Sequence, residues 1–207
     1  MIVTEVETHT QSRYKIYIDG EFAFVLYKGE LRIYGIEKGK CLAESDYNEI
    51  TQKILPKRAK LRCMNLLKSK RYTRKQLADK LRQGFYSENV IEEALAYVES
   101  YGYVDDRQFA YDFIEYHMTQ KSRIRIRMDL CKKGIPFELT DEIWNEINGD
   151  DSGDMERQQI IRYLKKKNYD VNTATLQEKS KIFSYLYRKG FQIETIRDLL
   201  SLDITSI

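Results

Sequence analysis

One short pattern occurs three times along the chain, at residues 77–85, 126–135 and 182–191. In each copy two apolar residues lie four positions apart, and a basic segment, a glycine and a further apolar residue follow. The glycines of successive copies are 50 and 56 residues apart (134 − 84 and 190 − 134). Repetition at such a period is typical of helical arrays in which each unit buries its apolar face against its neighbour. We therefore predict a mainly α fold, with three tandem three-helix repeats that form an elongated, curved array.

The first 50 residues differ from the rest and predict a small β module. Tyr14–Ile18 and Glu21–Leu26 are rich in aromatic and β-branched residues, and the intervening Asp19-Gly20 suits the positive φ angles of a type I′ turn. We expect this β-hairpin module to span residues 1–50 and to pack on the first helix. The predicted three-helix repeats then occupy residues 51–105, 106–148 and 149–207.

Local signals place several helix boundaries within these repeats. Pro56 interrupts or restarts a helix, because its ring clashes with the preceding turn. Gly84 suits the position just after a helix, where left-handed geometry is free for glycine. Asp105 is predicted to cap the next helix, with Gln108 three residues later. In the second repeat, Leu130 is predicted to face inward.

Charge alternates in step with the repeats. Residues 53–84 hold twelve Lys and Arg and one acid, whereas residues 86–115 hold eight acids and one base. Residues 121–134 hold six bases and one acid, and residues 136–156 hold eight acids and no base. Residues 157–190 return to nine bases and two acids. This alternation fits two hypotheses equally well: oppositely charged helix faces that pair with one another, or a basic stripe that follows a phosphate backbone.

The sequence contains no pattern typical of an active site or a metal centre. There is no nucleophile elbow, Walker loop, zinc-ligand spacing or paired-carboxylate setting, so we expect neither an enzyme nor a cofactor. Cys41, Cys63 and Cys131 are far apart and are predicted to be small core residues. Neither a signal peptide nor an apolar stretch of about 18 residues is present, so we expect a soluble cytoplasmic protein without a membrane contact.

Basic residues near the second helix of the first two repeats are the candidate contacts to a partner. At 100° per residue they lie away from the apolar face or at the opening of the helix, so we expect them to be exposed. One aromatic ring among them could stack on a base, although core packing is the commoner use of a tyrosine. The candidates are Arg71, Tyr72, Arg74, Lys75, Arg82, Lys121, Arg123, Arg125, Lys132 and Lys133.

Three segments carry a resemblance to a known family: Arg71–Gly84, Tyr101–Ala110 and Leu130–Ile135. They are similar to the corresponding segments of the RecX family of recombination regulators. The resemblance is strong over residues 57–147 and looser over residues 155–200, and the β-rich N-terminal extension resembles that of the longer members from Gram-positive bacteria. It implies a cytoplasmic bacterial protein that binds the RecA recombinase filament on DNA. It also implies inhibition of recombination, ATP hydrolysis and co-protease activity.

Two other functions remain open from the residues alone. Three-helix units resemble helix-turn-helix modules, so the chain could be a DNA-binding regulator that acts without RecA. An α-solenoid adaptor without nucleic acid is a third hypothesis, although the basic second helices argue against it. Few side chains suited to reading bases gather at one helix N-terminus, so we expect single- or double-stranded DNA to be bound weakly and without sequence preference. We also expect the protein to be a monomer.

Overall fold

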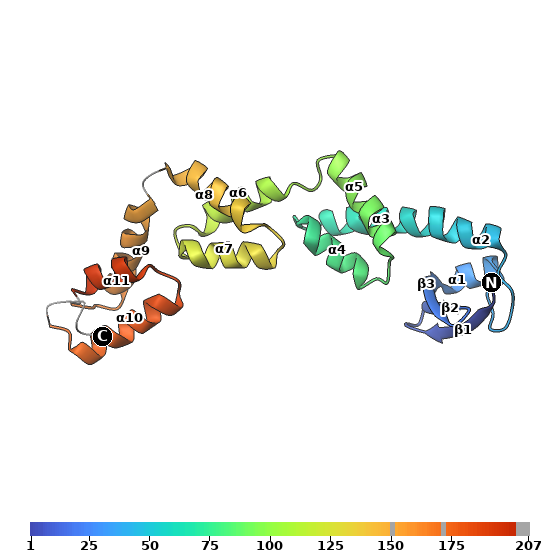
Figure 1. Ribbon diagram of the computed structural model, residues 1–207, viewed down its shortest axis with the longest axis horizontal. Coiled ribbons are helices and arrows are strands. Elements are labelled where there is room, and N and C mark those ends of the chain that lie inside the picture. The colour runs from blue at the N-terminus through green and yellow to red at the C-terminus, as the bar shows by residue number, and fades with distance from the viewer. Residues whose placement is uncertain (150–151, 171–172, 202–207) are drawn as a thin grey trace. The chain divides into compact units, whose positions relative to one another are not determined.

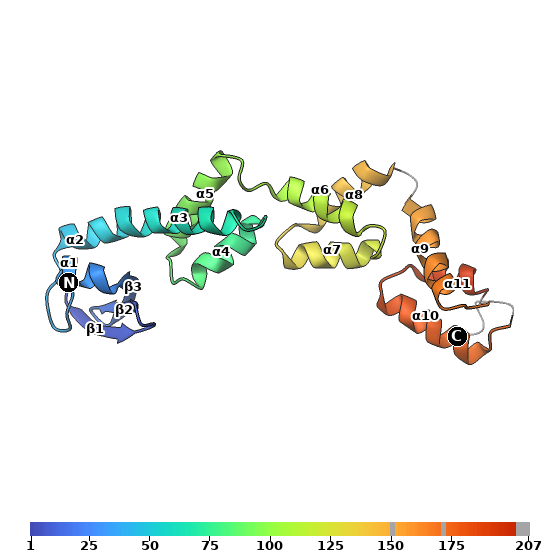
Figure 2. The same cartoon turned by 180° about the vertical axis from the view of Figure 1, so that it is seen from behind.

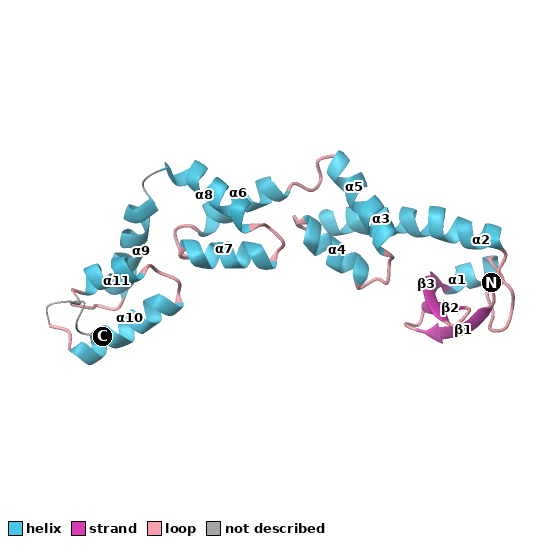
Figure 3. Cartoon of the chain, viewed as in Figure 1, coloured by secondary structure: helices cyan, strands magenta, loops and turns pink. Residues whose placement is uncertain are grey.

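The computed structural model describes residues 1–149, 152–170 and 173–201 (Figure 1). These residues are mainly helical, with a small antiparallel sheet at the N-terminus (Figure 3), which confirms the predicted fold class. The chain divides into two compact units, Met1–Asp105 and Asp106–Ile207. Each unit has its own hydrophobic packing.

The sheet has three strands in the order β1-β2-β3, with β1 at Val3–Thr8, β2 at Arg13–Ile18 and β3 at Glu21–Tyr27. The predicted hairpin is β2–β3. Its turn has φ of 49° at Asp19 and 90° at Gly20, the positive values that a type I′ turn requires. Strand β1 pairs antiparallel with β2 and adds a third strand to that hairpin.

Six helical segments follow the sheet in the first unit. They are α1 (Lys28–Ile33), α2 (Glu44–Glu49), η1 (Ile50–Ile54), α3 (Leu55–Leu67), α4 (Arg74–Arg82) and α5 (Glu88–Ser100). The short π-helix η1 joins α2 to α3 just before Pro56. There the Leu55 N–H donates to the Ile50 carbonyl, five residues back. This hydrogen bond makes the turn wider than in an α-helix, and the wider turn leaves room for the proline ring.

The sheet and the first three-helix unit share one core. Ile16, Phe24 and Leu26 from the sheet belong to the same buried cluster as Cys63 from α3 and Leu77 from α4. Each of these five side chains is at most 1% exposed. The β module therefore packs on the helices as predicted, and its burial is part of the stability of the first unit.

Within its described residues, the second unit contains two groups of three helices (Figure 2). The first group is α6 (Asp106–His117), α7 (Arg123–Lys132) and α8 (Phe137–Asn148), and helix α6 begins directly after Asp105. Its core includes Ile126, Leu130 and Trp144, so the inward placement of Leu130 is confirmed. The second group is α9 (Ser152–Lys166), α10 (Leu176–Arg188) and α11 (Ile193–Leu200), packed around Ile160 and Leu186.

Polar contacts join these two groups within the second unit. The Ser122 hydroxyl, at the start of α7, donates to the Lys189 carbonyl at the end of α10 over 2.6 Å. The buried Gln159 amide of α9 donates to the carbonyls of Met118 and Lys121. The approach is close enough that a Cβ on Gly190 would lie 2.9 Å from the Ser122 oxygen. The loop between α6 and α7 is thus fixed to both α9 and α10.

The left-handed residue after the second helix differs from the sequence prediction in the first repeat. Gly134 and Gly190 have φ of 94° and 82°, but in the first repeat it is Phe85, with φ of 63°, that has this geometry rather than Gly84. The position of the left-handed residue depends on its distance from the last buried leucine of the helix. Phe85 lies four residues after Leu81, and each of the other two glycines also lies four residues after the last buried leucine of its helix. The prediction for Gly84 was therefore wrong by one residue.

The cysteine prediction holds for one residue of three. Cys63 is buried in the first core, whereas Cys41 and Cys131 are exposed. In the described part of the chain no group of three or more His, Cys, Asp or Glu side chains is placed to hold a metal ion. No helix within the same residues has the length and apolar character needed to cross a membrane.

Candidate partner interface

The second helix of each three-helix group begins at a hydroxyl cap. Thr73 accepts from the Gln76 N–H over 3.2 Å and Ser122 from the Arg125 N–H over 3.3 Å. Thr175 accepts from the N–H of the third helical residue in the same way. A cap side chain occupies one of the N–H groups that the first turn leaves unpaired. The caps fix where each helix starts, and so fix the direction of the basic side chains that follow.

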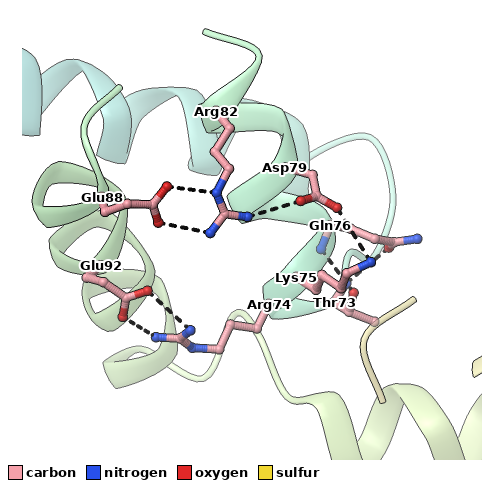
Figure 4. Close-up of polar contacts among 8 residues, drawn as sticks. All are labelled: Thr73, Arg74, Lys75, Gln76, Asp79, Arg82, Glu88 and Glu92. Carbon is pink, nitrogen blue, oxygen red and sulfur yellow. Dashed lines mark hydrogen bonds and ion pairs between the residues drawn. The ribbon is translucent and has the colours of Figure 1, made fainter. Parts of the chain in front are cut away.

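Two basic residues of α4, Arg74 and Arg82, form ion pairs with the acidic helix α5 (Figure 4). Arg74 lies 2.6 Å from the Glu92 carboxylate and 2.8 Å from that of Glu99. Arg82 contacts Glu88 over 2.8 Å and Asp79 over 3.1 Å. The hydrogen bond from Arg82 lowers the pKa of Glu88 and raises the pKa of Arg82 itself. The alternating charge of the sequence here pairs neighbouring helices of one repeat.

Lys75 lies on α4 beside the same acid that Arg82 contacts. Its ammonium group is 3.9 Å from the Asp79 carboxylate, one helical turn along. At that separation, and with both side chains about half exposed, the pair adds little to stability.

Helix α7 repeats this arrangement with helix α8. Arg123 lies 2.9 Å from the Asp141 carboxylate, and its guanidinium lies over the Trp144 ring at 5.7 Å. Asp129 accepts from Lys121 over 2.9 Å and lies 3.3 Å from Arg125. Partial burial alone would raise the pKa of the Asp129 carboxyl, but the hydrogen bond from Lys121 and the charges of Lys121, Arg125 and Lys132 together outweigh this, so the pKa lies below its ordinary value. Asp129 therefore holds two of the candidate cations at the start of α7.

The ten candidate residues fall into two classes by exposure. Five are half-buried, and for two of these the contacts are aromatic: Tyr72 packs against the first core with Lys70 over its ring at 4.8 Å, and Lys133 lies over Phe113 at 5.6 Å. The half-buried residues are Tyr72, Arg74, Lys121, Arg123 and Lys133. The exposed residues are Arg71, Lys75, Arg82, Arg125 and Lys132. Pairing between helices explains the placement of Arg74 and Arg123, and it also involves Arg82 of the exposed class.

Two basic residues outside the candidate set lie beside two members of it. Arg188 and Lys189, at the end of α10, line the same cavity as Lys121 and Arg125, which has a volume of about 540 Å³. The sequence held a signal for them, since both precede Gly190 in the third copy of the repeated pattern. Their neighbours in space could not be read from the pattern, because Ser122 and Lys189 are 67 residues apart along the chain.

Comparison with known families identifies two of the helical groups. Residues 59–97 match the model described as "RecX, first three-helix domain", and residues 105–142 match "RecX, second three-helix domain". The first match covers most of α3 to α5, and the second covers α6, α7 and the beginning of α8.

Whole-chain comparisons agree with these matches. The chain is 35% identical to a protein named "Regulatory protein RecX" from Caldanaerobacter subterraneus subsp. tengcongensis, over 98% of this chain and 100% of that protein. A protein of the same name from Clostridium acetobutylicum is 27% identical, over 95% and 92% of the two chains. Among solved structures, "Crystal structure of regulatory protein RecX" matches with a TM-score of 0.61 at 20% identity, over 98% of this chain and 99% of that one. RecX from Lactobacillus salivarius matches with a TM-score of 0.58 at 21% identity, over 73% and 98%.

Proposed function

The chain belongs to the RecX family of regulatory proteins, and from this we infer that it binds the RecA recombinase filament on DNA and inhibits its recombination, ATPase and co-protease activities. The observation that carries the proposal is the full-length relationship to a protein named as a RecX regulator. On this proposal the chain is a cytoplasmic, monomeric regulator rather than an enzyme, and it needs no cofactor.

The charge arrangement supports contact with a nucleoprotein filament. Exposed cations occur on or next to the second helix of both repeats, Arg71 and Lys75 at α4 and Arg125 and Lys132 on α7. Such groups attract DNA phosphates or acidic protein surface without reading bases. We therefore expect DNA alone, single- or double-stranded, to be bound weakly and without sequence preference.

The test is RecA-dependent ATP hydrolysis on single-stranded DNA with increasing amounts of this protein, at two salt concentrations. Inhibition should weaken as salt rises, because screening limits exposed charges to a reach of about 8 Å at physiological ionic strength. The test variant carries Arg71→Gln, Lys75→Gln, Arg125→Gln and Lys132→Gln, and should inhibit RecA much less than the wild type. Charge reversal at Arg74 would instead place a carboxylate beside Glu92 and Glu99, so that position is left unchanged.

A matched control loses the same charge elsewhere in the chain. Lys28→Gln, Lys38→Gln, Lys53→Gln and Lys57→Gln change four exposed lysines outside α4 and α7, and should inhibit RecA as the wild type does. If the test variant folds and inhibits fully, the exposed cations of α4 and α7 are not the contact. If the wild type leaves RecA activity unchanged but binds one duplex sequence preferentially, the alternative of a DNA-binding regulator without RecA is correct.

A further inference from the structure

A basic cavity lies between the start of α7 and the end of α10, inside the second unit. Its volume of about 540 Å³ is in the range of pockets that hold small molecules. Four cationic side chains line it, Lys121, Arg125, Arg188 and Lys189, and none of the described residues that line it is acidic. The positive charge of such a lining attracts anions.

The charge of the pocket is only partly compensated from outside it. Asp129 pairs with both Lys121 and Arg125, so one negative charge is shared by two cations. Arg188 donates from Nε to the Ser184 carbonyl, and Lys189 lies over the Tyr185 ring at 5.5 Å. Neither of these partners carries a negative charge, so the four cations exceed the Asp129 carboxylate by three charges (4 − 1).

Fixed backbone positions hold the pocket in shape. The Ser122 hydroxyl caps α7 and donates to the Lys189 carbonyl, so the basic ends of the two helices are tied together. The positive end of the α7 dipole lies at the same place, at the start of a helix of 10 residues. Gly190 permits this approach, because a Cβ there would lie 3.2 Å from Cβ of Ile124 as well as against Ser122.

The remaining wall of the pocket is aromatic. Tyr185 and Phe191 line it, and Tyr185 is held by a stacked ring, Tyr163, at 4.7 Å. A phosphate group suits the cations, and a sugar and base suit the aromatic wall. We propose that this pocket is a binding site for a phosphorylated nucleoside. Its source is either one nucleotide of single-stranded DNA or a free mononucleotide.

The test uses the full-length protein without RecA and follows the backbone amides of Ser122 and Gly190 by NMR. The probes are inorganic pyrophosphate, thymidine 5′-monophosphate, thymidine and an oligothymidylate of about 20 nucleotides. The variant Arg188→Gln/Lys189→Gln removes two pocket cations and keeps the Lys189 carbonyl. The control Lys165→Gln/Lys166→Gln removes the same charge from exposed residues of α9.

Pyrophosphate and the monophosphate should shift both amides in the wild type and in the control, and thymidine should not. The pocket variant should lose about tenfold in affinity, with a shallower dependence on salt. Shifts with the monophosphate and not with the oligonucleotide identify a free nucleotide as the ligand, whereas shifts with both identify one nucleotide of DNA. The proposal is overturned if no phosphate-bearing probe shifts these amides, if thymidine binds as well as its phosphate, or if the pocket variant and the control behave alike.

The DNA form of this inference rests on the proposed function, since it specifies where a DNA strand would contact the protein. The two can fail separately, because the NMR assay contains no RecA. If the protein does not inhibit RecA but the amides of the pocket still shift with phosphate-bearing probes, only the RecA proposal is rejected. If the protein inhibits RecA but no phosphate-bearing probe shifts the amides of the pocket, only this binding site is rejected.

Discussion

The Phe85 ring packs edge-on against the His9 imidazole, with 5.0 Å between the ring centroids, while the backbone of Phe85 has a left-handed φ of 63°. The second and third repeats have a glycine at the same place, where this geometry is free of strain. Phe85 also contacts Phe22 of strand β3 at 5.9 Å, and Lys15 lies over its ring. The first repeat thus has a strained residue whose side chain joins the end of α4 to the sheet.

This relationship predicts different costs for two truncations of Phe85. Phe85→Ala removes the ring and keeps the strain, whereas Phe85→Gly removes both, so the alanine variant should be less stable by about 1 kcal/mol. Both should be less stable than the wild type because the ring contacts are lost. Urea unfolding followed by circular dichroism measures the difference. Equal stability of the two variants would show that the backbone at Phe85 carries no strain.

The helix caps predict a second comparison. Ser122→Ala removes the acceptor for the Arg125 N–H and also the bond to the Lys189 carbonyl, whereas Thr175→Ala removes only local contacts at the start of α10. The loss of a cap costs about 1 kcal/mol, and a further lost hydrogen bond about as much again. Ser122→Ala should therefore lower the unfolding midpoint more than Thr175→Ala. Equal midpoints would mean that the bond to Lys189 contributes nothing to stability.

The packing of Leu130 predicts a large effect in the second core. Its side chain is fully buried, so Leu130→Ala should cost about 2–5 kcal/mol. Met128, on the same helix, is 46% exposed, and Met128→Ala should cost less than about 0.5 kcal/mol. The single tryptophan, Trp144, belongs to this core, so its fluorescence reports the unfolding directly. A cost for Met128→Ala as large as for Leu130→Ala would contradict the helix register.

Sequence periodicity was sufficient for the features that depend on nearby residues. The β2–β3 hairpin follows from Asp19-Gly20, and the inward face of α7 follows from the spacing of Ile126 and Leu130, because both are local geometry. The error at Gly84 has a local cause as well. The presence of a glycine suggested that Gly84 has the left-handed geometry. The left-handed residue instead lies four residues after the last buried leucine of the helix, and in the first repeat this residue is Phe85.

Features that depend on chain packing could not be read in the same way. The charge alternation left pairing between helix faces as one of two hypotheses, and it did not show that Arg74 would pair with Glu92 across two helices. The approach of Arg188 to Lys121 depends on the junction at Ser122, which no periodic pattern encodes. The exposed Cys131 shows the same limit, since an apolar neighbourhood in sequence does not fix which side of α7 is covered.

The last prediction concerns the pH dependence of the Asp129 cluster. The pKa of Asp129 lies below its ordinary value of 3.8, so its ion pairs with Lys121 and Arg125 stabilise the folded state above the unfolded pKa. This contribution is lost as pH falls through the lower folded pKa. Asp129→Asn should therefore cost about 1 kcal/mol at pH 7, a figure reduced for solvent screening, and the gap to wild type should close as the pH falls below about 4. Urea unfolding followed by Trp144 fluorescence measures the gap at each pH.

Glu138→Gln, at an exposed position of α8, is the control and should stay within about 0.5 kcal/mol of the wild type. A gap for Asp129→Asn that is unchanged from pH 7 to pH 3 would mean that the loss comes from packing and not from the charge of the carboxylate.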